Sequence, residues 1–178
     1  MKKILFCLFA LVLASCDTED IISQLVEGTV KADINGQTHT WNFGVNSLGA
    51  VITSETAGTE TIYALGVAAS TDGVSDNSET KSIGIVVFID HPDDVVAGAS
   101  FSTPSDIVLG TYAYDNEAGT SSIDADQTLS ATLNIASVND SEGTISGTFN
   151  YETTDEDTGI TYTISNGSFT DIPYHYDF

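Results

Sequence analysis

Residues 142–173, EGTISGTFNYETTDEDTGITYTISNGSFTDIP, decide the fold of this chain. Apolar and polar side chains alternate here, which is typical of strands with one buried face, because successive side chains point to opposite faces of a sheet. Glu142-Gly143 and Thr158-Gly159 lie in or beside the expected turns. The residues that share a face are Ile145, Phe149 and Tyr151 in one predicted strand, and Ile160, Tyr162 and Ile164 in the next.

Two Asn-Gly pairs mark special backbone positions. Asn35-Gly36 suits a type I′ hairpin turn, which needs positive φ at both central residues. Asn166-Gly167 is either a hairpin turn or a bulge in a strand that continues to Ile172. The first pair follows an alternating run made of Val30, Ala32 and Ile34.

The two-residue period extends over most of the chain. Residues 81–90 carry apolar side chains on both faces, which predicts a central strand covered on both sides. Residues 91–106 are expected to be irregular, with one helical turn near residues 93–96, and residues 115–127 to be a polar loop. A 3.6-residue period is nowhere sustained. An all-β fold is therefore predicted.

About nine or ten antiparallel strands joined by loops favour a β-sandwich, with a lipocalin-like closed barrel as the alternative. The difference matters for function, because a closed barrel offers an internal cavity for a small apolar ligand.

The N-terminus reads MKKILFCLFALVLASC, a positive start, an apolar run and small residues before Cys16. The apolar run is shorter than the roughly 20 residues of a membrane span. The ending Leu13-Ala14-Ser15-Cys16 resembles the lipobox of bacterial lipoproteins. That resemblance implies cleavage before Cys16 and attachment of lipid to its thiol. We therefore expect a signal peptide at 1–15, a lipidated N-terminus and tether at 16–26, and a single all-β domain at 27–178.

The acidic stretch after the cysteine predicts where in the cell the protein is located. Asp17, Glu19 and Asp20 resemble the export signal that follows the lipidated cysteine in Bacteroidota surface lipoproteins. The expected localisation is the cell envelope, with the chain anchored to the outer membrane by lipid and displayed at the cell surface.

Several short segments resemble an uncharacterised Bacteroidota lipoprotein family. They are the hairpin from Ile34-Asn35-Gly36 to Trp41, the Gly110-Thr111-Tyr112 strand, and the ISGTF and ISNGSF segments of residues 145–149 and 164–169. The resemblance implies an all-β domain in the cell envelope. It implies no activity and no catalytic residues, because the function of that family is unknown.

The charge is strongly unbalanced. The chain has 26 acidic residues against four basic ones, all of them lysine, and its formal net charge is −22. Nucleic acid is excluded as a partner, because phosphate binding requires clustered cations. The absence of arginine also removes the bidentate clamp for carboxylate or phosphate groups.

No catalytic residues are predicted. The chain has no Gly-x-Ser-x-Gly motif, and His39, His91 and His175 lack the spacing of a transition-metal site. The expectation is that the protein is not an enzyme and holds no transition metal. Acidic loops at residues 72–79, 115–126 and 155–157 offer the oxygen ligands that Ca²⁺ prefers, without matching an EF-hand loop.

The candidate ligand-binding residues are aromatic. Trp41, Tyr112 and Tyr114, together with Tyr151 and Tyr162, either line a platform for a glycan or pack in the core and pair across strands. The chain alternates aromatics once more in residues 173–178, PYHYDF, which are expected to be an edge strand that closes the domain. The leading function is a non-enzymatic binding or assembly module of the envelope with a glycan or protein partner. The alternatives are a barrel that carries a small apolar ligand, and a hydrolase.

Overall fold

The computed structural model describes residues 28–42, 46–57, 59–71, 81–116 and 119–178. The predicted signal peptide, Cys16, the tether and the acidic loop at 72–79 lie outside these residues. The elements are β1 (Thr29–Ile34), β2 (Gln37–Asn42), β3 (Ser47–Ala57), β4 (Glu60–Ser70), β5 (Lys81–Ile89), the 3-10 helix η1 (Pro92–Asp94), β6 (Ser100–Ser102), β7 (Val108–Asn116), β8 (Gly119–Ile123), the 3-10 helix η2 (Ala125–Gln127), β9 (Thr128–Asn139), β10 (Thr144–Thr154) and β11 (Thr161–Asp177).

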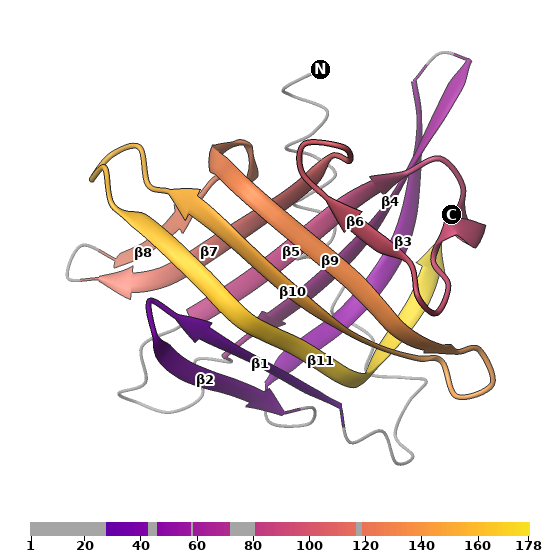
Figure 1. The fold of residues 1–178 in the computed structure, drawn as a ribbon, viewed down its shortest axis with the longest axis horizontal. Coiled ribbons are helices and arrows are strands. Elements are labelled where there is room, and N and C mark those ends of the chain that lie inside the picture. The colour runs from indigo at the N-terminus through magenta and orange to yellow at the C-terminus, as the bar shows by residue number, and fades with distance from the viewer. Residues whose placement is uncertain (1–27, 43–45, 58, 72–80, 117–118) are drawn as a thin grey trace.

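The strands form two layers that share β11. Neighbouring strands are hydrogen-bonded in the order β6-β9-β10-β11-β3-β4-β5-β7-β8. Outside this order, β1 pairs with both β11 and β2. In Figure 1, β9, β10 and the first part of β11 cross in front of β3, β4, β5 and β7. The last part of β11, from Tyr174 to Asp177, pairs in parallel with Ala50–Thr53 of β3 and so enters the second layer.

The predicted all-β sandwich is confirmed, and the closed barrel is wrong. Within the described residues the sheet path ends at β6 and β8, which are not neighbours in the hydrogen-bonding order, so the sheet is not closed. The described residues form eleven strands rather than nine or ten, and the β11–β3 pair is parallel. The short strands β6 and β8 account for the difference, because their polar sequences looked like loops.

The local predictions at both Asn-Gly pairs are resolved. Asn35 and Gly36 have φ of 50° and 83°, as a type I′ turn requires, and they join β1 to β2. Asn166 has a φ of 51° inside β11, where the pairing register with β10 shifts. The second pair is therefore a bulge within a strand and not a hairpin turn.

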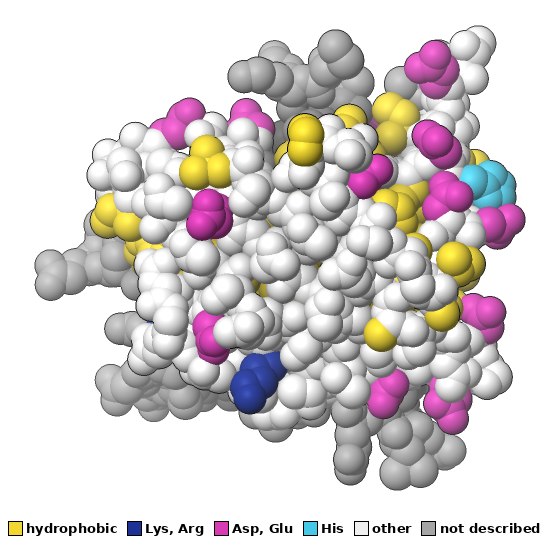
Figure 2. Space-filling model, in the orientation of Figure 1, with side chains coloured by type: hydrophobic (Ala, Val, Ile, Leu, Met, Phe, Trp, Pro, Cys, Tyr) yellow, Lys and Arg dark blue, Asp and Glu magenta, His cyan; other side chains and the backbone are white. Residues whose placement is uncertain are grey.

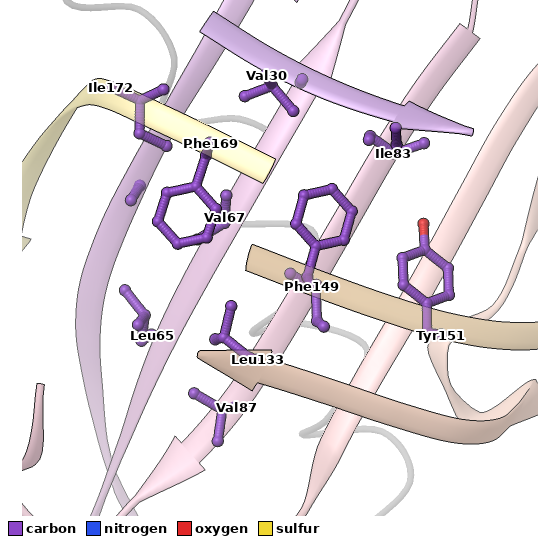
Figure 3. Packing of buried hydrophobic residues seen from close by; sticks show 14 of the residues in the cluster. Val30, Leu65, Val67, Ile83, Val87, Leu133, Phe149, Tyr151, Phe169 and Ile172 are labelled. Carbon is purple, nitrogen blue, oxygen red and sulfur yellow. The ribbon is translucent and has the colours of Figure 1, made fainter. Parts of the chain in front are cut away.

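The core lies between the two layers. Figure 3 shows Phe149 and Phe169 extending from the front layer toward the layer that carries Leu65 and Val67. Trp41, Tyr151 and Phe169 are among the largest fully buried side chains. The predicted double coverage of residues 81–90 is also found, because Ile85 faces this core while Val86 belongs to a separate buried cluster.

Three glycines make room for three of the core rings. Gly147 pairs with Phe169, and Gly167 pairs with Phe149, across the β10–β11 ladder. A Cβ atom at Gly147 would lie 2.4 Å from the Phe169 ring, and one at Gly167 would lie 2.6 Å from the Phe149 ring. In the other layer, a Cβ at Gly110 would lie 2.3 Å from Tyr151. Each ring therefore occupies the space that a side chain would take.

Replacing Gly147 by alanine tests this packing. The new Cβ would lie 2.2 Å from the Asn134 carbonyl oxygen, which is backbone and cannot rotate away. We expect Gly147→Ala to lower the free energy of unfolding by about 3 kcal/mol, measured by urea denaturation. Gly49→Ala is the matched control, because a Cβ there meets its nearest neighbour at an ordinary 3.5 Å. Equal stabilities of the two variants would contradict the packing argument.

Candidate binding surface

The three predicted ligand-binding residues lie near one end of the sandwich. Trp41 and Tyr112 are buried, and Tyr114 is half-buried. The Trp41 Nε1–H donates to the Lys81 carbonyl oxygen at 3.3 Å, and Lys81 pairs opposite Tyr114 in the β5–β7 ladder. Trp41 and Tyr112 therefore contribute to the core, and their role in ligand binding stays a prediction.

A tyrosine cluster, made of Tyr112, Tyr114 and Tyr162, joins the two layers at this end. The ring centroids lie 5.3 Å apart for Tyr112–Tyr114, 5.0 Å for Tyr112–Tyr162 and 5.4 Å for Tyr114–Tyr162. Tyr112 and Tyr114 come from β7, and Tyr162 comes from β11. Sequence reasoning included all three among the candidate aromatics, although it could not show that they meet.

Asp155 fastens the tyrosine cluster to the β10–β11 loop. It accepts a hydrogen bond from the Tyr114 hydroxyl at 3.2 Å and others from the backbone N–H groups of Asp157 and Thr158. Partial burial acts to raise the pKa of Asp155, but the hydrogen bonds from Thr158, Asp157 and Tyr114 outweigh it and lower that pKa. The carboxylate and these donors form a structural brace.

A second aromatic group was missed by the sequence reasoning. Five rings follow one another in the order Tyr174, Tyr176, Phe178, Tyr63 and His91, and we call them the aromatic ladder. Successive centroids are 5.9, 5.6, 6.0 and 6.0 Å apart. The first three pairs are edge-to-face, an arrangement that the quadrupole of an aromatic ring favours.

The aromatic ladder runs from the core to solvent. Tyr174 is buried in the main core and Tyr63 packs against that core. Tyr176 and Phe178 are 50% and 68% exposed. The exposed rings lie in the middle of the ladder, between the buried Tyr174 and the partly buried Tyr63, and they keep large aromatic surface in contact with water.

Hydrogen bonds hold the ladder at both ends. At the buried end, the Tyr174 hydroxyl donates to the Asp140 carboxylate. Burial, followed by this bond to Asp140, raises the pKa of Tyr174. At the other end, His91 caps η1. The His91 Nδ1 accepts a hydrogen bond from the backbone N–H of Asp93 at 3.2 Å, and the backbone N–H of His91 donates to the Asp94 carboxylate at 2.9 Å.

Acidic and hydrophobic side chains gather at the end of the molecule where β11 and η1 meet. Figure 2 shows carboxylates, one histidine and hydrophobic side chains close together along the right edge of this face, where Figure 1 places the end of β11 and the η1 turn. The residue after η1, Val95, is buried in the main core and fixes the turn there.

The ladder left only a weak signal in the sequence. Alternating aromatics in residues 173–178 were noticed, but they were expected to close the domain as an edge strand. The structure agrees with that expectation: Tyr174–Asp177 pairs in parallel with β3, with Asp177 opposite Thr53, and no second described strand pairs with these four residues. Tyr63 and His91 join through the tertiary fold, because they lie more than 80 residues before the other three rings.

Metal binding has no support in the described part of the chain. Among those residues, no group of three or more His, Cys, Asp or Glu side chains is placed to hold a metal ion. Ca²⁺ binding at the acidic loops stays a prediction, and the loop at 72–79 lies outside the described residues. None of the described helices is long and apolar enough to cross a membrane.

Comparisons of this chain with protein-family models, with curated proteins and with solved structures give no match. Its class is therefore defined by its own geometry, an all-β sandwich with an exposed aromatic ladder at one end. The resemblance to a Bacteroidota lipoprotein family stays a prediction.

The tyrosines predict how stability depends on alkaline pH. Burial raises the pKa of Tyr151, Tyr162 and Tyr174 above the ordinary tyrosine value. In the unfolded chain these phenols ionise near pH 10, whereas in the folded chain they stay protonated. The unfolded state then binds fewer protons, so the free energy of unfolding is highest below about pH 10 and falls above it.

Tyr151 is fully buried and gives the largest effect. It contributes a slope of up to about 1.4 kcal/mol per pH unit above pH 10. The measurement is urea denaturation between pH 8 and 11.5, with Tyr151→Phe as the variant that removes this part of the slope. A free energy of unfolding that does not change over this range would contradict the prediction.

Proposed function

We propose that this chain is a lipid-anchored, non-enzymatic binding module of the bacterial cell envelope. The observation that carries the proposal is the aromatic ladder, because Tyr176 and Phe178 present large ring surfaces to solvent at the end of an otherwise well-buried core. Exposed aromatic surface next to polar groups is typical of interaction sites, where rings supply contact area at little entropic cost.

Two further features bear on the proposal. The tyrosine cluster and Asp155 form a hydrogen-bonded brace, in which the groups are engaged with one another. The carrier alternative depended on a closed barrel, and the sheet is not closed. An aromatic surface on a rigid sheet needs no further chemistry to bind a partner.

The anchor is proposed from the first 16 residues. Lipid on Cys16 gives stable attachment because several acyl chains are added, and each buried methylene contributes about 0.8 kcal/mol. Residues 16–27 reach at most about 40 Å when extended, so the domain stays close to the membrane surface. The acidic residues Asp17, Glu19 and Asp20 support display on the outer face of the outer membrane.

Incorporation of labelled palmitate tests the anchor. We expect label in the wild type and none in Cys16→Ala, because the thiol of Cys16 is the acceptor. Cys7→Ala is the matched control: it changes the other cysteine of the chain, lies within the predicted signal peptide, and should keep the label. Label retained in Cys16→Ala, or absent from the wild type, would overturn the proposed anchor.

Protease treatment of intact cells tests the proposed location. We expect the wild-type protein to be digested, with a periplasmic protein of the same cells protected as the control. Protection of the wild-type protein would contradict surface display and place the domain on the periplasmic side.

A further inference from the structure

We infer that the aromatic ladder binds a cationic segment of a partner protein, one that presents lysine or arginine side chains. The inference rests on the proposed binding function and names its partner class. It is argued from the geometry of the rings, from the position of the charges and from the exposure of the ladder.

The ring geometry favours a cation over a sugar. The interplanar angles along the ladder are 65°, 78° and 73° for the pairs from Tyr174 to Tyr63. Neighbouring rings therefore face different directions and cannot form the flat platform on which a pyranose ring stacks. A compact cationic group needs only one exposed ring face, because the negative face of a single ring attracts it.

The charges around the ladder have the matching sign. Asp140 holds the buried end through Tyr174, and Asp93 and Asp94 surround His91 at the other end. Carboxylates on both sides of the rings strengthen the attraction of a cation and repel an anion.

The described part of the chain supplies no lysine to the ladder. Its two lysines are Lys31 in β1 and Lys81 in β5, and neither belongs to the segments that form the ladder. With a formal net charge of −22, the chain as a whole attracts positively charged partners over a distance. A cationic partner therefore both approaches faster and finds its counter-charges at the rings.

The contact surface is an extended row and not an enclosed pocket. Two of the five rings, Tyr174 and Tyr176, are alternate residues of β11, and Phe178 directly follows the last residue of that strand. The centroids of these three rings follow one another at 5.9 and 5.6 Å. A peptide segment with several charged side chains fits such a row better than a single small amine does, because each side chain can reach a different ring.

The probe that tests the inference is a dye-labelled hexa-arginine peptide. Its binding to the purified full-length chain in a neutral detergent is measured by fluorescence anisotropy at 150 mM salt. A peptide of equal length with citrulline in place of arginine is the uncharged control. We expect binding of hexa-arginine and at least tenfold weaker binding of the citrulline peptide.

Variants of the ladder separate it from general attraction to an acidic protein. We expect Tyr176→Ala combined with Phe178→Ala to weaken hexa-arginine binding at least tenfold. The matched control is Leu129→Ala combined with Ile160→Ala, two large hydrophobic side chains that are 62% and 49% exposed outside the ladder. Tyr176→Phe should retain binding, because the ring is kept.

Two variants that each remove one negative charge test whether the carboxylates near the ladder contribute to binding. Asp140→Asn keeps an acceptor for the Tyr174 hydroxyl but removes the charge, and we expect weaker hexa-arginine binding. Glu152→Gln removes one charge from an exposed position on β10 and should leave binding unchanged. Circular dichroism of each variant confirms that it is folded.

Each remaining outcome is decisive. Equal affinity of the ladder variant and its control, or no binding of hexa-arginine by the wild type, overturns the inference. Ladder-dependent binding of a neutral oligosaccharide such as maltohexaose, without binding of the peptide, overturns the cationic partner and leaves the proposed binding function standing.

Discussion

The fold depends on a reciprocal exchange between β10 and β11: a glycine in each strand leaves the space that a phenylalanine ring of the other strand fills. Phe169 of β11 lies over Gly147 of β10, and Phe149 of β10 lies over Gly167 of β11. A shift of the register by one residue would place a side chain under each ring and turn the apolar face outward. The exchange thus fixes the register of the two strands, and the tight approach gives a dense core.

The exchange also constrains the rest of β11, which is the longest of the described strands and belongs to both layers. Along this one strand, Tyr162 joins the tyrosine cluster, Phe169 packs in the core and Tyr174 begins the aromatic ladder. Since the exchange sets the position of the middle of β11, it also sets the position of both ends. The proposed binding surface is therefore placed by the same contacts that stabilise the sandwich.

Much of the fold could be predicted because its signals are local. The turn at Asn35-Gly36 and the two covered faces of β5 follow from backbone preference and from side-chain alternation, and the structure confirms both. The helical turn expected near residues 93–96 is η1 at Pro92–Asp94. The strand β6 was missed because its three residues are too few to show a period, and β8 was missed because residues 119–122 are Gly-Thr-Ser-Ser and show no alternation.

The candidate site was harder to predict because it is assembled by long-range contacts. The aromatic ladder needs the parallel pairing of β11 with β3, and no short-range pattern announces that pairing. Two of the three predicted residues, Tyr112 and Tyr114, do meet in one cluster, but their partner Tyr162 comes from the other layer. Sequence patterns identify which residues are aromatic and on which face they lie, and the fold decides which of them meet.

The acidic side chains show how this protein treats its own charge. Many of the described carboxylates accept hydrogen bonds from neutral groups: Asp33 from Asn166 at 2.8 Å, Asp106 from the Ser102 N–H at 2.8 Å, and Asp171 from the Ser146 hydroxyl at 3.0 Å. The hydrogen bond from Asn166, followed by one from Thr38, lowers the pKa of Asp33. Such hydrogen bonds hold loops and bulges in place, and they do not neutralise the charge of the carboxylates. With two lysines in the described residues, the negative charge is balanced from outside the molecule, by dissolved cations or by a partner that carries them. On a surface that combines carboxylates with exposed rings, a cationic partner replaces dissolved cations and also gains contacts with the rings.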